Sequence, residues 1–123
     1  MIIFILILIK RVISIQMEIY HSLYENTKNL ITPLSDIQKV STVQLIPKLD
    51  QKGHDLLFFL IRMYHNQQTH NVSFHIPYQA GSKEDKTNDV EFDLDNFPVH
   101  LQHILYMFVR MHYEYISYES SRS

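Results

Sequence analysis

The strongest constraint on the fold is a helical pattern that runs from Asp50 to Tyr64. One face of this segment carries apolar or small residues at helical spacing: Gly53, Leu56, Leu57, Leu60, Ile61 and Tyr64. Its other side is apolar as well, through Phe58, Phe59 and Met63. A helix that is apolar nearly all round must be buried on more than one side, so other elements have to pack around it. Asp50 is a typical helix-capping residue, and we expect the helix to end at residues 66–68.

The scarcity of glycine points toward the same class of fold. The 123 residues include two glycines and four prolines, too few for an all-β fold that is rich in tight turns, and this length supports one domain. A net charge of -2 leaves no overall electrostatic footprint for binding nucleic acid. Because the chain has no cysteine, we exclude disulfide scaffolds, cysteine-bound zinc and thiol nucleophiles.

Three further helices are predicted. The first lies within Met17–Asn29, where apolar residues recur at helical spacing. The second spans residues 33–44, because Thr32 and Pro33 resemble a helix start and are followed by an apolar stripe of Leu34, Ile37 and Val40. The third starts near Pro98. Its stripe consists of Leu101, Ile104, Leu105, Phe108, Val109 and His112, and Tyr115 and Ile116 could extend it.

Two segments alternate in the manner of β-strands. Val72, Phe74, Ile76 and Tyr78 alternate with more polar residues, and a polar loop of residues 79–88 follows. From Asp89 to Asp95 acidic and apolar residues alternate strictly, with Val90, Phe92 and Leu94 between the four acids. We therefore predict an antiparallel hairpin between helices, with Pro77 favouring an edge position for the first strand. The fold class is mainly α with a small antiparallel β-hairpin (α+β).

The acidic strand allows two interpretations. Its row of carboxylates is either a solvated hairpin face or a docking edge for an extended basic partner, which would add to it by main-chain pairing. The second interpretation makes residues Asp89, Val90, Glu91, Phe92, Asp93 and Leu94 the candidate peptide-binding site. It requires one edge of the strand to be free, since the predicted neighbour at Val72–Tyr78 could occupy the other.

The apolar N-terminus has three interpretations. The run from Ile2 to Ile9, followed by Lys10 and Arg11, is shorter than the ~20 residues that cross a bilayer. It also lacks the charge order of a signal peptide. The first interpretation is a start-site artefact, with translation beginning at Met17. A buried strand or helix segment is the second and a membrane anchor the third.

Catalytic and metal chemistry find little support in the sequence. His100 and His103 could share a helix face, and three more histidines, His65, His70 and His75, surround the first predicted strand. Spacing alone brings two ligands together at most, whereas zinc sites need three or four. Because no phosphate loop, nucleophile elbow or triad signature is present, we expect neither an enzyme nor a cofactor.

Residues 36–116 resemble a known family, the extra-terminal (NET) domain of the bromodomain-and-extra-terminal proteins. The matching segments are Lys39-Val40-Ser41, Ile46-Pro47-Lys48-Leu49, the helix through Leu60, Asp89 to Leu94, Pro98, and Leu101 to Val109. Two departures are an insertion from His70 to Lys86, which carries an extra strand, and the lack of a bromodomain. Similar stand-alone domains occur in large DNA viruses.

This resemblance implies a NET-like helical domain that binds short peptides in which lysines alternate with apolar residues. It implies that Glu91 and Asp93 contact the partner's cations and that Val90, Phe92 and Leu94 border the groove. We therefore expect a protein-interaction module in transcription or chromatin-linked regulation, with no direct nucleic acid or membrane contact and an intracellular location, nuclear or cytoplasmic. The alternative is a structural or assembly protein with no peptide-reading role.

The predicted organisation has four parts. These are an apolar N-terminal extension (1–16), an N-terminal helical segment (17–31), the NET-like domain (32–118) and a flexible tail (119–123).

Overall fold

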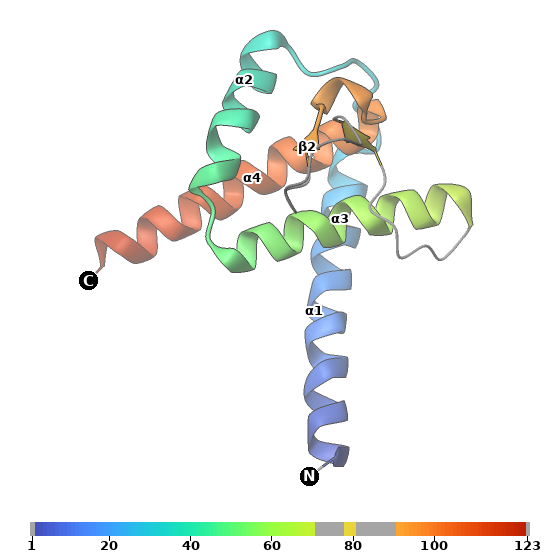
Figure 1. Ribbon diagram of the computed structural model, residues 1–123, viewed down its shortest axis with the longest axis vertical. Coiled ribbons are helices and arrows are strands. Elements are labelled where there is room, and N and C mark those ends of the chain that lie inside the picture. Colours follow the sequence, from blue (N-terminus) through green and yellow to red (C-terminus); the bar gives the residue numbers. More distant parts are fainter. Residues whose placement is uncertain (1, 71–77, 81–90, 123) are drawn as a thin grey trace.

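The computed structural model describes residues 2–70, 78–80 and 91–122. They form four α-helices: α1 (Ile2–Thr27), α2 (Asp36–Leu45), α3 (Gln51–Thr69) and α4 (Val99–Ser121). Two short 3-10 turns, η1 (Ile46–Lys48) and η2 (Leu94–Asn96), precede α3 and α4. The prediction of a mainly helical domain is confirmed (Figure 1).

Helix α4 is the centre of the domain, because it contacts each of the other three helices. Five residues of its predicted stripe are buried: Leu101, Ile104, Leu105, Phe108 and Val109. Pro98 immediately precedes the helix, as the sequence predicts. The helix continues to Ser121, three residues into the predicted tail.

Helix α3 begins where the sequence places it. Asp50 is the N-cap, and its carboxylate accepts a hydrogen bond from the Gly53 backbone N–H at 2.8 Å. All six residues of its predicted stripe are buried, and Phe58, Phe59 and Met63 are half-buried. The helix ends at Thr69, and His70 closes it in a left-handed conformation with φ 56°.

Helix α2 differs from its prediction in both its start and its orientation. It begins at Asp36, because Ser35 and Gln38 form a capping box that satisfies two backbone N–H groups. Leu34 is buried ahead of the helix, whereas Ile37 and Val40 are exposed. The face that packs on the domain holds Thr42, whose hydroxyl donates to the Gln38 carbonyl at 2.8 Å. The prediction that Leu34, Ile37 and Val40 form one stripe that faces the core is therefore wrong.

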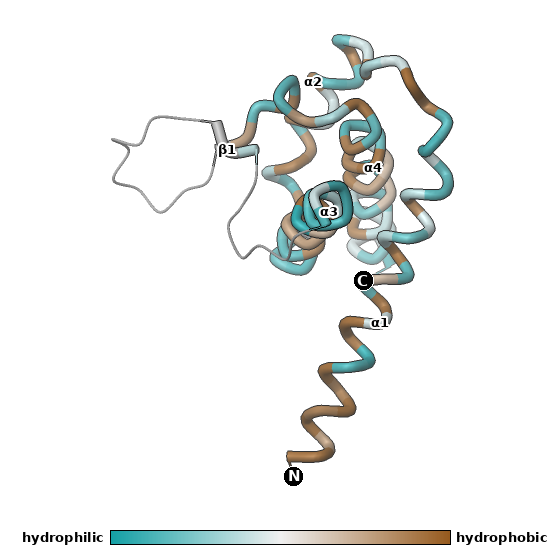
Figure 2. The backbone as a smooth tube through the Cα atoms, turned by 90° about the vertical axis from the view of Figure 1, so that its right-hand side faces the viewer, coloured by the Kyte–Doolittle hydropathy of each residue, from teal (hydrophilic) through white to brown (hydrophobic). Residues whose placement is uncertain are grey.

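Helix α1 joins two segments that the sequence analysis separates. The predicted helix within Met17–Asn29 is its second half, which buries Tyr20, Leu23 and Thr27. The apolar run of residues 2–9 forms its first half, which extends away from the domain with its side chains exposed (Figure 1, Figure 2). This run is helical but exposed, so of its three interpretations that of a buried strand or helix segment is wrong for the single chain. None of the helices among the described residues has the length and apolarity to cross a membrane.

The acidic strand is shorter than predicted. β2 (Glu91–Phe92) pairs antiparallel with β1 (Gln79–Ala80), and Gln79 lies opposite Phe92. The strand does not continue to Asp95, because Asp93 caps η2 by accepting a hydrogen bond from the Asp95 N–H at 3.0 Å. Tyr78 lies in a turn, and the rest of the first predicted strand (72–77) falls outside the described residues, as do Asp89 and Val90.

Candidate functional site

A groove separates α2 from the end of the acidic segment. It has a volume of about 500 Å³ and is lined by Lys39, Val40, Val43 and Gln44 of α2 and by Phe92, Asp93, Leu94 and Asp95. The segment that the sequence singled out therefore forms one wall of a groove. The opposite wall comes from a helix whose part in the site was not expected.

The α2 wall is apolar because this helix turns its apolar face outward. Val40 is 54% exposed and Val43 is 56% exposed, and Ile37 next to them on the same face is 83% exposed. The domain-facing side can be polar because Thr42 satisfies its hydroxyl within the helix. An apolar face that no described part of the domain covers is an unusual feature of so short a helix, and it borders the groove.

The acidic wall alternates between inward and outward side chains. Phe92 is half-buried, with its ring centroid 5.9 Å from that of Phe58 and 5.6 Å from that of Phe97. Leu94 is buried, whereas Asp93 and Asp95 are exposed. The predicted alternation thus holds from residue 92 to 95 even though the strand ends at Phe92. Two carboxylates consequently stand at the rim of the groove over an apolar floor.

One lysine of the chain already contacts this acidic rim. Lys39 Nζ lies 2.7 Å from Asp95 Oδ1 and joins α2 to η2 across the groove. The hydrogen bond to Asp95 raises the pKa of Lys39 above its ordinary value. Asp95 therefore has an internal cation, while Asp93 uses one oxygen to cap η2.

A buried glutamine holds the acidic wall in place. Gln102 of α4 is 4% exposed, and its Nε2 donates to the carbonyls of Leu94 (3.2 Å) and Phe97 (3.1 Å). Its Oε1 accepts from the Leu34 N–H at 3.4 Å, so one side chain ties η2 to the segment that leads into α2. Gln102 is not among the residues predicted from the sequence to form the site. The available signal was its position three residues before Leu105 and seven before Val109, which places a polar group on the buried face.

The remaining candidate positions are described in part. Asp89 and Val90 lie outside the described residues, and for Glu91 the structure describes the backbone alone. Among the described residues β2 has one neighbouring strand, β1, and no strand pairs with its second edge. The docking hypothesis needs that free edge.

Two of the histidines considered as metal ligands, His100 and His103, contact groups outside any metal site. His100 Nε2 lies 3.0 Å from Thr27 Oγ1 and 3.2 Å from the Tyr24 carbonyl, which connects α4 to the end of α1. His103 Nε2 lies 2.6 Å from the Thr32 carbonyl. Burial lowers the pKa of His100, so its neutral form is favoured. Within residues 2–70, 78–80 and 91–122 no three metal-binding side chains converge.

We compared the chain with protein-family models, with curated proteins and with solved structures, and none of the three comparisons finds a match.

Proposed function

We propose that this chain is a protein-interaction domain that binds short, extended, basic peptides in the groove between α2 and the acidic segment. The observation that carries the proposal is the pairing of two unlike walls. Exposed Val40 and Val43 face a rim on which Asp93 and Asp95 are exposed. An extended peptide that alternates cationic and apolar side chains matches such a groove, because successive side chains of a strand point to opposite sides.

The proposed mechanism is strand addition. The peptide's main chain pairs with the second edge of β2 at Glu91 and Phe92, which supplies affinity that does not depend on its sequence. Its lysines or arginines approach the carboxylates of Glu91 and Asp93, and its apolar residues lie against Val40 and Val43. Charge then selects the partner and speeds the encounter, whereas main-chain pairing and the apolar contacts supply the affinity.

The family resemblance gives this proposal its biological setting. If the chain is a NET-like domain, its role is in transcription or chromatin-linked regulation inside the cell, nuclear or cytoplasmic, with no catalytic step and no cofactor. Lys39 and Val40 line the groove and also belong to one of the segments that resemble the family. The competing function is a structural or assembly protein with no peptide-reading role.

A titration separates these two functions. A peptide of alternating lysine and isoleucine is titrated into the full chain and into the double variant Glu91→Lys, Asp93→Lys. The matched control is Asp55→Lys, Glu114→Lys, which makes the same change in net charge at two exposed positions outside the groove. We expect the first variant to bind at least about tenfold more weakly and the control to bind nearly as the unchanged chain does, with all binding weaker in high salt. No binding at millimolar peptide, or equal losses in both variants, would contradict the proposal.

A further inference from the structure

A second apolar surface has no role in the groove. From Ile2 to Ile15 every large apolar side chain of α1 is between 45% and 76% exposed. Figure 2 shows this half of the helix projecting from the domain, mostly hydrophobic but with a short hydrophilic stretch between its hydrophobic parts. So much apolar surface on one projecting element is characteristic of a segment that meets a partner.

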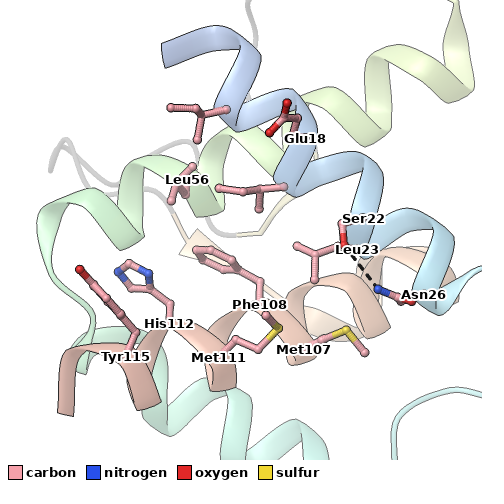
Figure 3. Close-up of a pocket in the computed structure, with 12 residues that line it drawn as sticks. Glu18, Ser22, Leu23, Asn26, Leu56, Met107, Phe108, Met111, His112 and Tyr115 are labelled. Carbon is pink, nitrogen blue, oxygen red and sulfur yellow. Dashed lines mark hydrogen bonds between the residues drawn. The ribbon is translucent and has the colours of Figure 1, made fainter. Parts of the chain in front are cut away.

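A pocket continues this surface into the domain. It has a volume of about 410 Å³ and lies where α1 crosses α4, with Ile15, Ile19 and Leu23 on one side and Met107, Phe108 and Met111 on the other. Figure 3 shows Phe108 and His112 rising from α4 toward α1 and Leu56. The pocket is large enough for one or two apolar side chains, and Ile15 at the end of the projecting half is one of its lining residues.

The pocket and the projecting half share one face of α1. Phe4 and Leu8 precede Ile15 by eleven and seven residues, which is the spacing of a single helical stripe, and Ile15 itself lines the pocket. A partner segment that fills the pocket and covers this stripe must be elongated and apolar along its length. The first half of α1 in a second copy of the chain has both properties.

The charges beside the stripe favour one orientation of such a pair. Arg11 and Glu18 are seven residues apart and so lie on the same side of the stripe, about 10.5 Å apart along the helix axis. In an antiparallel pair, side chains on the same flank of the two helices face each other, so Arg11 of each copy meets Glu18 of the other. A parallel pair would place the same flanks on opposite sides of the interface, so neither Arg11 nor Glu18 would meet an opposite charge of the other copy. The antiparallel arrangement centres near Ile15 and brings Phe4 and Leu8 of each copy over the other copy's pocket.

From these relations we infer that α1 mediates antiparallel self-association. Two copies pair through the stripe Phe4, Leu8, Ile15 and Ile19, and the apolar tip of each α1 occupies the pocket between α1 and α4 of the other. The contact is isologous, so it closes as a dimer and does not propagate. It is independent of the peptide groove, which lies against α2.

A pair of leucines tests the stripe. Leu8 lies on the stripe and Leu6, two residues away, lies on the opposite side of the helix, although the two are similarly exposed at 45% and 52%. Sedimentation of the full chain at micromolar concentrations should show a dimer. Leu8→Lys should raise the dissociation constant by at least about tenfold, and Leu6→Lys should change it by much less. If the unchanged chain sediments as a monomer, the inference is overturned. Equal effects of the two variants also overturn it, because they indicate non-specific association or insertion into lipid.

Engineered cysteines test the orientation, and the absence of native cysteine makes the result unambiguous. Arg11→Cys and Glu18→Cys variants are oxidised separately and as a mixture. The antiparallel pair predicts a disulfide-linked dimer in the mixture and little in either variant alone, since identical positions lie about 10 Å apart along the axis, too far for a disulfide. Equal cross-linking of the separate variants overturns the antiparallel arrangement.

Discussion

Lys39 on α2 and Asp95 on η2 form an ion pair across the mouth of the groove, with Nζ 2.7 Å from Oδ1. The pair connects the two walls on which peptide binding is proposed to depend. It also means that the chain supplies a cation to its own acidic rim. A basic peptide that reaches Asp95 has to compete with Lys39, whereas one that uses Asp93 and Glu91 does not.

Removing the internal cation should therefore strengthen peptide binding. Lys39→Gln leaves Asp95 without its partner and makes the rim more negative, so we expect the alternating lysine–isoleucine peptide to bind tighter by a factor on the order of 3. Isothermal titration calorimetry measures the change, with Lys52→Gln on the exposed start of α3 as a control of equal charge. Weaker binding to Lys39→Gln than to this control would show that Lys39 holds the groove in its binding shape.

Gln102 should be essential to the stability of the acidic wall. Replacing it with leucine removes the side-chain partner of the Phe97 carbonyl and of the Leu34 N–H, while the Leu94 carbonyl keeps the Phe97 N–H. A buried polar group without its partner costs about 1–3 kcal/mol. We expect the unfolding free energy in urea to fall by about 2 kcal/mol, and Gln68→Leu at an exposed site of α3 to have little effect. A stability for Gln102→Leu equal to that of the control would mean that the site relaxes around the leucine.

Gly53 is required because α4 comes close to the first turn of α3. A Cβ atom at this position would lie 2.7 Å from His112 Cδ2. The His112 ring cannot move away freely, because it is hydrogen-bonded to Asp50 and stacks on Phe108. Crowding of this kind costs about 1–3 kcal/mol, more than the ~1 kcal/mol that alanine gains over glycine in a helix. Gly53→Ala should thus destabilise the unchanged chain but stabilise a chain that already carries His112→Ala. Chemical denaturation of the unchanged chain, the two single variants and the double variant would measure both effects. Stabilisation in both backgrounds would contradict the close approach.

The contact between Asp50 and His112 should make stability fall at low pH. His112 Nε2 lies 2.8 Å from Asp50 Oδ1, and this hydrogen bond, together with that from the Gly53 N–H, lowers the pKa of Asp50 below its ordinary value of 3.8. The charged carboxylate is thus favoured in the folded state. Its contribution is complete above the ordinary pKa and is lost as the pH falls through the lowered one.

Asp50→Asn tests this linkage. We expect it to be less stable than the unchanged chain at pH 7 and the difference to narrow below about pH 4 in denaturation curves. The effect should be modest, because the Asp50 side chain is 50% exposed and solvent screens it. A difference that stays constant from pH 7 to pH 2 would exclude the carboxylate's charge as its cause.

The parts of the fold that the sequence predicted are those with a dominant repeating pattern. Helices α3 and α4 follow from apolar stripes that bury almost every member, so local periodicity and tertiary packing agree. For α2, local periodicity and tertiary packing disagree. Its apolar stripe is exposed, because the Ser35–Gln38 capping box sets its start and a satisfied Thr42 allows its polar face to pack inward.

The candidate site was predictable only on its acidic side. The alternation at Phe92–Asp95 correctly separates inward from outward side chains, although Asp93 ends the strand by capping η2. The second wall depends on how α2 is oriented, and the brace at Gln102 depends on a contact between residues 68 positions apart. The orientation of α2 is not local, so no spacing in the sequence reveals it. The spacing of Gln102 to Leu105 and Val109 places it on the buried face of α4, but it does not reveal the partners of its side chain.

The measurement that tests the central claim most directly is a map of backbone amide shifts. The alternating lysine–isoleucine peptide is titrated into the ¹⁵N-labelled full chain, and the shift of each assigned amide is followed. Peptide binding in the groove predicts saturable shifts concentrated at residues 39–44 and 91–95, with those at Glu91 and Phe92 among the largest. Shifts centred on the α1–α4 pocket at Ile19 and Met111, or none at millimolar peptide, would contradict it.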